Sequence, residues 1–200
     1  IMIMYKRNDS FQKIDRLDFL SGILSMNVEF LQNIGLACGK LGIAIFFYHY
    51  AQYTGNRYYN EFAGSLIDDM SDHINNRAPL DFNNGLTGIG WGITYLVRKG
   101  FIEGVVDEIL EEIDFAISEG LNDIILSKQI NEEKVTGYNY YRLARNNNNQ
   151  WDGIEIFSFI KPSSRDDKHL TIPFLINPDN YGLFYGIAGE AFMLLSTVWH

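Results

Sequence analysis

Leu36-Ala-Cys-Gly-Lys-Leu-Gly42 is the first copy of a motif that decides the fold of this chain. Further copies are Phe82-Asn-Asn-Gly-Leu-Thr-Gly88 and Leu183-Phe-Tyr-Gly-Ile-Ala-Gly189, with a weaker one, Lys134-Val-Thr-Gly-Tyr-Asn-Tyr140, between them. The first glycines of successive copies are 46, 52 and 49 residues apart. A near-constant period of this size is typical of repeat proteins. The sequence therefore predicts a single repeat domain over residues 1–200, with motifs near 36–42, 82–88, 134–140 and 183–189.

Apolar residues recur at helical spacing on both sides of the motifs. The helix that opens in a motif is apolar almost all round, which predicts burial, and the helix after it carries Asp and Glu on one face, which predicts exposure. An inner helix paired with an outer helix, repeated along the chain, is typical of a curved or closed α/α array. We therefore expect an all-α fold with helices over residues 11–32, 39–54, 57–75, 86–98, 104–118, 138–145 and 190–199.

Three segments interrupt the helical pattern. Residues 146–149 are a run of four asparagines, which predicts a polar loop. Alternating apolar residues within 151–161 favour a short strand. The stretch around Pro173 and Pro178 is expected to be extended, because the residue before a proline avoids the helical region.

Composition narrows the class of protein. At 46% hydrophobic residues, 200 residues are enough to bury a sizeable core. The net charge of −9 argues against a nucleic-acid partner, which requires clustered Lys and Arg. The sequence has no apolar run of about 18 residues, so we expect no membrane span, and its first residues do not have the pattern of a secretory signal. A single cysteine excludes an internal disulfide framework, and we expect a cytoplasmic protein.

The glycine motifs resemble those of the lanthionine synthetase C-like family, the cyclases and cyclase-like proteins of ribosomally made thioether peptides. The resemblance covers residues 35–195 and rests on four segments, 35–42, 84–92, 137–145 and 182–189. It implies an α/α toroid, an inner ring of helices surrounded by an outer ring. Full-length members carry about seven helix pairs, whereas this chain has about four motif helices. We therefore expect a partial or shortened ring, and a role in lanthipeptide biosynthesis and peptide modification.

The same resemblance implies a chemistry that this chain matches only in part. Active members add a peptide cysteine to a dehydrated Ser or Thr, and a zinc ion held by two Cys and one His lowers the pKa of the thiol. Those ligands lie just before the motif glycine. Here the corresponding pairs are Ala37-Cys38, Asn83-Asn84, Val135-Thr136 and Phe184-Tyr185.

Only Cys38 among these residues is a zinc ligand by type, and a catalytic zinc site needs about three protein ligands. None of the four histidines, at positions 49, 73, 169 and 200, occupies a motif position. We therefore predict no metal site beyond Cys38 as a single candidate ligand, and no cofactor is evident, although zinc is expected for active family members. Thioether cyclisation and peptide binding without the full zinc site both remain open.

The expected partner is a peptide substrate or precursor peptide, held where the inner helices begin. Aromatic side chains on these helices can line a central cavity, an arginine can pair with a carboxylate, and an amide can bind the peptide backbone. Glycines at the motif positions let neighbouring helices or loops approach closely and leave N–H groups that favour an anion. Core packing and helix capping are the alternative roles. The predicted substrate-binding residues are Cys38, Asn84, Trp91, Tyr138, Arg142 and Tyr185.

Two other function classes stay open. A carbohydrate-active α/α-barrel enzyme needs two opposed carboxylates in the central cavity. The acidic clusters at 68, 69 and 72 and at 108, 111 and 112 lie on predicted outer helices, where a solvated face is expected, and Glu190 is the acid nearest the ring. The other class is a non-catalytic interaction scaffold.

Overall fold

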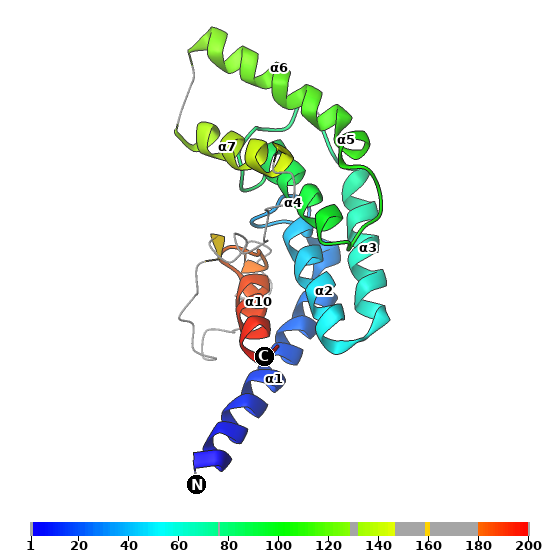
Figure 1. Ribbon diagram of the computed structural model, residues 1–200, viewed down its shortest axis with the longest axis vertical. Helices are drawn as coiled ribbons and strands as arrows, with labels where there is room; N and C mark the ends of the chain where they lie inside the picture. Colours follow the sequence, from blue (N-terminus) through cyan, green and yellow to red (C-terminus); the bar gives the residue numbers. More distant parts are fainter. Residues whose placement is uncertain (1, 76, 129–131, 147–158, 161–179, 200) are drawn as a thin grey trace.

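The computed structural model describes residues 2–75, 77–128, 132–146, 159–160 and 180–199, with side chains from residue 11 onward except that of residue 133 (Figure 1). Within these ranges the protein is all-α and contains no strand, which confirms the predicted class. Its elements are α1 (Met2–Asn27), the short 3-10 helix η1 (Val28–Phe30), α2 (Lys40–Thr54), α3 (Arg57–Ser71), α4 (Leu86–Arg98), α5 (Val106–Ile109), α6 (Glu111–Ser127), α7 (Glu132–Asn146) and α10 (Ile187–Val198).

Helices α2 and α4 form the centre of the described fold. In α2 every residue from Leu41 to Ala51 is buried except the partly buried His49, and in α4 every residue from Leu86 to Leu96 is buried. Neither span carries a Lys, Arg, Asp or Glu, so neither helix places a charged group in the core. Helix α3 packs along α2 and α6 lies against α4 (Figure 1). Each of these covering helices buries only one face, as the predicted inner and outer pattern requires.

The first and last described helices lie side by side. Helix α10 packs against both α1 and α2, while the start of α1 projects from the body (Figure 1). The guanidinium of Arg16 on α1 donates from Nε to Oε1 of Glu190 on α10 at 2.8 Å. Both side chains are partly buried. Glu190, the acid expected nearest the ring, is therefore committed to an ion pair between two helices.

Several predicted helix boundaries were wrong. Helix α1 begins at Met2 rather than near residue 11, and α6 continues through Gly120 to Ser127 rather than ending at 118. Gly120 lies inside this helix and Leu80 packs closely against it: a Cβ atom there would lie 3.0 Å from Leu80 Cδ1. The weak motif copy lies inside α7 and forms no loop. The predicted strand and extended stretch lie outside the described residues except for 159–160, and of the predicted loop only Asn146, the last residue of α7, is described.

A charged network fastens α7 to α5 and α6. Arg145 on α7 contacts Asp107 at 2.8 Å through Nη1 and Asp114 at 2.6 Å through Nη2. The hydroxyl of Tyr141, one turn earlier on α7, donates to the same Asp114 carboxylate. The Arg145 side chain is 17% exposed and that of Asp114 35%, so this ion pair is partly shielded from water and contributes more than a surface pair does. The Asp107 side chain is 82% exposed, so its ion pair with Arg145 contributes little.

We expect Arg145→Met to lower the free energy of unfolding by about 2 to 3 kcal/mol, because it leaves the partly buried Asp114 without its cation. The matched control is Arg57→Met, which breaks the exposed Arg57–Glu61 pair on α3 and is expected to cost less than about 0.5 kcal/mol. Urea denaturation followed by circular dichroism measures both. Equal losses in the two variants would contradict the proposed role of the network.

Candidate functional site: the motif-loop face

The three well-matched motif copies fold into the same loop. In each copy the first motif glycine is the N-cap of the following helix and has an extended backbone. The early N–H groups of the helix donate to carbonyls seven residues back, as in Lys40 N to Asn33 O at 2.9 Å and Leu86 N to Pro79 O at 2.8 Å. In the last copy the second residue of the helix makes the equivalent bond, from Ala188 N to the carbonyl of residue 181 at 3.2 Å. These donors are therefore used within the chain and are not free to bind an anion.

The second motif glycine allows the loop to fold back onto its own helix. A Cβ atom at Gly42 would lie 2.2 Å from the carbonyl oxygen of Leu36, and the equivalent contacts in the other two copies are 1.9 and 2.1 Å. Real Cβ atoms do not approach a carbonyl this closely, so any side chain would force the loop away. The spacing of the two glycines is thus explained by one local structure rather than by helix–helix packing alone.

The three loops also bind one another, and Ala37 lies between the other two. Its N–H donates to Asn83 O at 2.6 Å, and its carbonyl accepts from Phe184 N–H at 3.2 Å. A Cβ atom at Gly35 would lie 2.3 Å from Asn84 Cα, and one at Gly182 would lie 2.3 Å from Ala37 O. The prediction that glycines permit close approach of neighbouring loops is confirmed here.

The convergence exposes a small surface, which we call the motif-loop face: Asn33, Cys38, Asn84 and Tyr185. The last three are the residues immediately before each N-cap glycine, and they are the sequence-predicted site residues that the fold brings together. Asn84 is exposed, Cys38 is partly buried, and Tyr185 is 46% exposed. Asn33 donates from Nδ2 to Asn84 Oδ1 at 3.0 Å. Asn84 therefore pairs with a neighbouring loop instead of capping its own helix.

The other predicted site residues lie elsewhere. Trp91 is fully buried in α4, where its ring stacks on Tyr95 at 5.6 Å between ring centroids, so it is not part of the motif-loop face. Tyr138 and Arg142 are on α7. Tyr138 lines a cleft with α6, and Arg142 is exposed.

Aromatic rings fill the space behind the motif-loop face. Phe159 lies 5.1 Å from Phe82, 5.4 Å from Phe184 and 5.6 Å from Trp91, measured between ring centroids. Tyr140 on α7 joins the same cluster at 5.0 Å from Phe159. In the described part of the chain, Trp91, Tyr140 and Phe184 therefore pack against Phe82 and Phe159 instead of lining an open cavity.

Two polar residues at or beside this surface, Asn33 and Lys40, were not predicted from the sequence as site residues. Asn33 and Asn180 stand at the same distance before the first glycine of their motif copies. This recurrence is the sequence signal that could have identified Asn33. Lys40, the first residue of α2, makes an ion pair with Asp69 on α3. The hydrogen bond from Lys40 holds the pKa of the Asp69 carboxyl below its usual value. Asp68, Asp69 and Asp72 are all exposed, as expected for an outer helix.

The residues at the motif-loop face do not fit the zinc site of the resembled family. The chain has a single cysteine, whereas that site uses two. At the positions equivalent to Cys38 stand an amide, Asn84, and a phenol, Tyr185, and neither type belongs to the usual zinc ligands. In the described ranges no group of three His, Cys, Asp or Glu side chains is placed to hold a metal ion.

Comparison with protein-family models, curated proteins and solved structures finds no match to this chain. Among the described helices none is long and apolar enough to cross a membrane.

Proposed function

We propose that this protein is a lanthionine synthetase C-like protein that binds a precursor peptide at the motif-loop face, without the zinc centre of the cyclases. The observation that carries the proposal is the joining of three motif loops through Ala37, which gathers Cys38, Asn84 and Tyr185 on one surface. We further propose that α2, α4, α7 and α10 are the inner helices, and α1, α3 and α6 the outer helices, of a partial or shortened α/α toroid.

The chemistry of the face suits a peptide. The Asn84 side chain has amide protons that can donate to a peptide carbonyl while its oxygen accepts from Asn33. Tyr185 presents an aromatic surface with a hydroxyl at its edge, a combination common in binding sites. Each such contact is worth about 1 kcal/mol, so several of them give a modest affinity that peptide sequence can modulate.

The described structure favours the carbohydrate-active alternative less. That reaction needs two opposed carboxylates facing the bound sugar. Of the acids closest to the inner helices, Glu190 pairs with Arg16 and Asp69 pairs with Lys40. Both carboxylates thus serve contacts between helices in the described part of the chain.

The proposal is tested by selecting a random linear peptide library displayed on phage against the purified protein. We expect enriched peptides to bind the double variant Asn84→Ala/Tyr185→Ala at least about tenfold more weakly, because two contacts of about 1 kcal/mol each exceed the ~1.4 kcal/mol that corresponds to a tenfold change. Asn60→Ala/Tyr58→Ala on α3 removes the same two residue types from an exposed surface and serves as the matched control.

Fluorescence anisotropy measures the affinities, and circular dichroism verifies that both variants are folded. Enriched peptides that bind the Asn84/Tyr185 variant as tightly as the wild type would refute the motif-loop face as the site. Failure to enrich any peptide would favour the scaffold alternative.

A further inference from the structure

Two hydrogen bonds fix which way the side chain of Asn33 is turned. The carboxamide of an asparagine has an oxygen end and a nitrogen end of nearly the same shape, so its neighbours decide its orientation. The backbone N–H of Gly35 can only donate, and it donates to Oδ1 of Asn33 at 2.8 Å. The nitrogen end of Asn33 therefore faces the second motif loop, where Nδ2 donates to Oδ1 of Asn84 at 3.0 Å.

The orientation of Asn33 in turn decides that of Asn84. If the Asn84 carboxamide were turned the other way, the N–H donors of the two side chains would face each other. The Asn84 side chain is exposed, and its Nδ2 makes no hydrogen bond with the described part of the chain. The N–H donors of Asn84 are therefore available to a ligand, while its oxygen is already in use.

The backbone on both sides of this pair is held in place. The backbone N–H of Asn84 donates to Oδ1 of Asp81 at 2.8 Å within the second motif loop. Gly35 in the first loop lies so close that a Cβ atom on it would be 2.3 Å from Asn84 Cα. The contact between the two loops thus keeps the asparagines side by side, and the rotation of the Asn84 side chain is what Asn33 restricts.

A fixed pair of N–H donors selects among the polar groups of a peptide. A backbone carbonyl or a carboxylate accepts hydrogen bonds and is satisfied by the Asn84 amide. An ammonium or guanidinium group only donates, so against the same amide it loses its hydrogen bonds to water and gains none. Tyr185 makes no such selection, because its hydroxyl both donates and accepts. On the motif-loop face, the selection between acceptors and donors therefore rests on Asn84.

We propose that Asn33 is a positioning residue that holds Asn84 with its amide nitrogen toward the ligand. The motif-loop face then selects a hydrogen-bond acceptor of the peptide, a carbonyl or a carboxylate, over ammonium and guanidinium groups. This inference rests on the function proposed above and names the class of group that the peptide presents to the site.

Nuclear magnetic resonance of the isotope-labelled full chain tests the orientation without any ligand. The side-chain amide signals of Asn33 and Asn84 are assigned from their disappearance in Asn33→Asp and Asn84→Ala. A hydrogen-bonded proton exchanges with water more slowly, so one amide proton of Asn33 is expected to exchange at least about threefold more slowly than those of Asn84. Equal exchange rates at the two residues, or slower exchange at Asn84, would overturn the proposal.

Asn33→Asp is expected to turn the Asn84 side chain around. Aspartate keeps an oxygen that accepts from the Gly35 N–H, but it places a second oxygen where the Asn33 amide nitrogen stood. The Asn84 nitrogen then faces this carboxylate and its oxygen faces the ligand, so exchange of an Asn84 amide proton becomes slower. A peptide enriched on the wild type from the random phage library is expected to bind Asn33→Asp at least about fivefold more weakly, because acceptor then meets acceptor.

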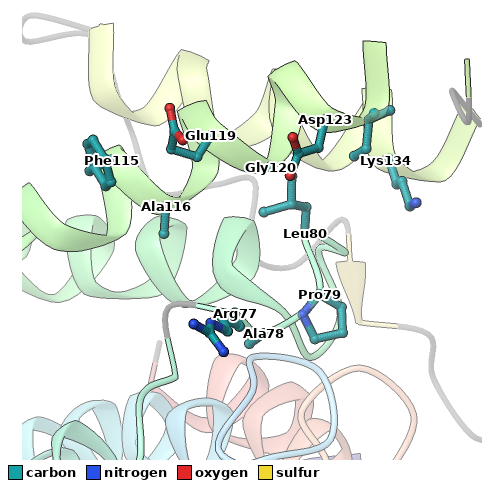
Figure 2. Close-up of a pocket in the computed structure, with 11 residues that line it drawn as sticks. Arg77, Ala78, Pro79, Leu80, Phe115, Ala116, Glu119, Gly120, Asp123 and Lys134 are labelled. Carbon is teal, nitrogen blue, oxygen red and sulfur yellow. The ribbon is translucent and has the colours of Figure 1, made fainter. Parts of the chain in front are cut away.

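Two controls separate this effect from the added negative charge. Because Asn33 acts through Asn84, adding Asn33→Asp to Asn84→Ala is expected to change the affinity less than about twofold. Asn122→Asp makes the same change in charge at an exposed residue of α6. This residue lies between Gly120 and Asp123, on the helix above the cleft in Figure 2, and its substitution is expected to change the affinity less than about twofold.

The same peptide distinguishes the two kinds of acceptor. Its Asp and Glu residues are replaced by Asn and Gln and its C-terminus is amidated: retained affinity assigns a carbonyl, and lost affinity assigns a carboxylate. Fluorescence anisotropy measures the affinities, and circular dichroism verifies that the variants are folded.

Unchanged affinity for Asn33→Asp, or an undiminished effect of this substitution in the Asn84→Ala background, would overturn the proposal. Failure to enrich any peptide would instead overturn the peptide site on which the proposal rests. The two failures are distinguishable, because the exchange rates of the amide protons show without a peptide whether Asn33 orients Asn84.

Discussion

A Gly35→Ala variant will lose about 3 kcal/mol or more of folding free energy. The added Cβ atom would lie 2.3 Å from Asn84 Cα and 3.0 Å from the carbonyl carbon of the same residue. Both contacts are with backbone, which cannot swing aside as a flexible side chain can. The first two motif loops must therefore separate, and the Ala37–Asn83 hydrogen bond is weakened with them.

Urea denaturation of Gly35→Ala beside Gly64→Ala measures this effect against a matched control. Gly64 lies inside α3, and a Cβ atom there would meet only Tyr48 Oη at 3.7 Å. Alanine favours a helix over glycine by about 1 kcal/mol, so Gly64→Ala is expected to stabilise the protein slightly. A Gly35→Ala variant as stable as the wild type would mean that the motif loops do not converge as described.

The second large effect concerns His49, which will make the protein less stable as the pH falls below about 6.5. Its Nε2 lies 2.6 Å from Tyr95 Oη, and its ring packs edge-on against Phe101 and Phe192. Burial in this aromatic surrounding, and next the nearby positive charge of Lys99, lower the pKa of His49 from 6.5 to about 4.

The direction of this change in stability with pH follows from which state of the chain, folded or unfolded, binds the proton at His49. Between pH 6.5 and pH 4 the unfolded chain is protonated at His49 and the folded chain is not, so protons favour unfolding. The full stability contribution is present above the unfolded pKa and is lost as the pH falls toward the folded pKa. The two values differ by about 2.5, which corresponds to about 3 kcal/mol between pH 7 and pH 4.

Urea denaturation at a series of pH values, with His49→Gln as the test variant, isolates this contribution. Glutamine retains an amide that can bond to Tyr95 and does not titrate, so the variant is expected to lose about 3 kcal/mol less than the wild type over this range. Lys99→Gln removes the nearby positive charge and is expected to reduce the effect in part, whereas Lys128→Gln at the far end of α6 is not. If the free energy of unfolding changes with pH in the same way in the wild type and in His49→Gln, the loss of stability at low pH does not come from His49.

The sequence predicted the motif helices well because their determinants are local. The observed bounds of α2 and α4 lie within one residue of the predicted ones, since the motif glycines open each helix and Gly55 and Gly100 follow their ends with a positive φ. The positions of the residues before each N-cap glycine also followed from the repeat. Three of the six predicted site residues, Cys38, Asn84 and Tyr185, accordingly lie together.

The remaining features depend on contacts that the local sequence does not contain. Leu80 packs against Gly120, forty residues later in the chain and inside α6. The pairing of α1 with α10 through Arg16 and Glu190 joins residues 174 positions apart. Trp91 packs against Phe159, which lies in a segment whose pattern favoured a strand. The periodicity of the sequence does not encode any of these long-range contacts.

Chemical-shift mapping tests the central claim, a peptide site at the motif-loop face, most directly. A peptide enriched on the wild-type protein is titrated into isotope-labelled protein, and the backbone amide signals are followed. We predict that the largest shifts fall on Cys38, Asn84 and Tyr185 and on the side-chain amide of Asn33. Shifts confined to α6 and α7, or spread without a maximum at the motif loops, would contradict it.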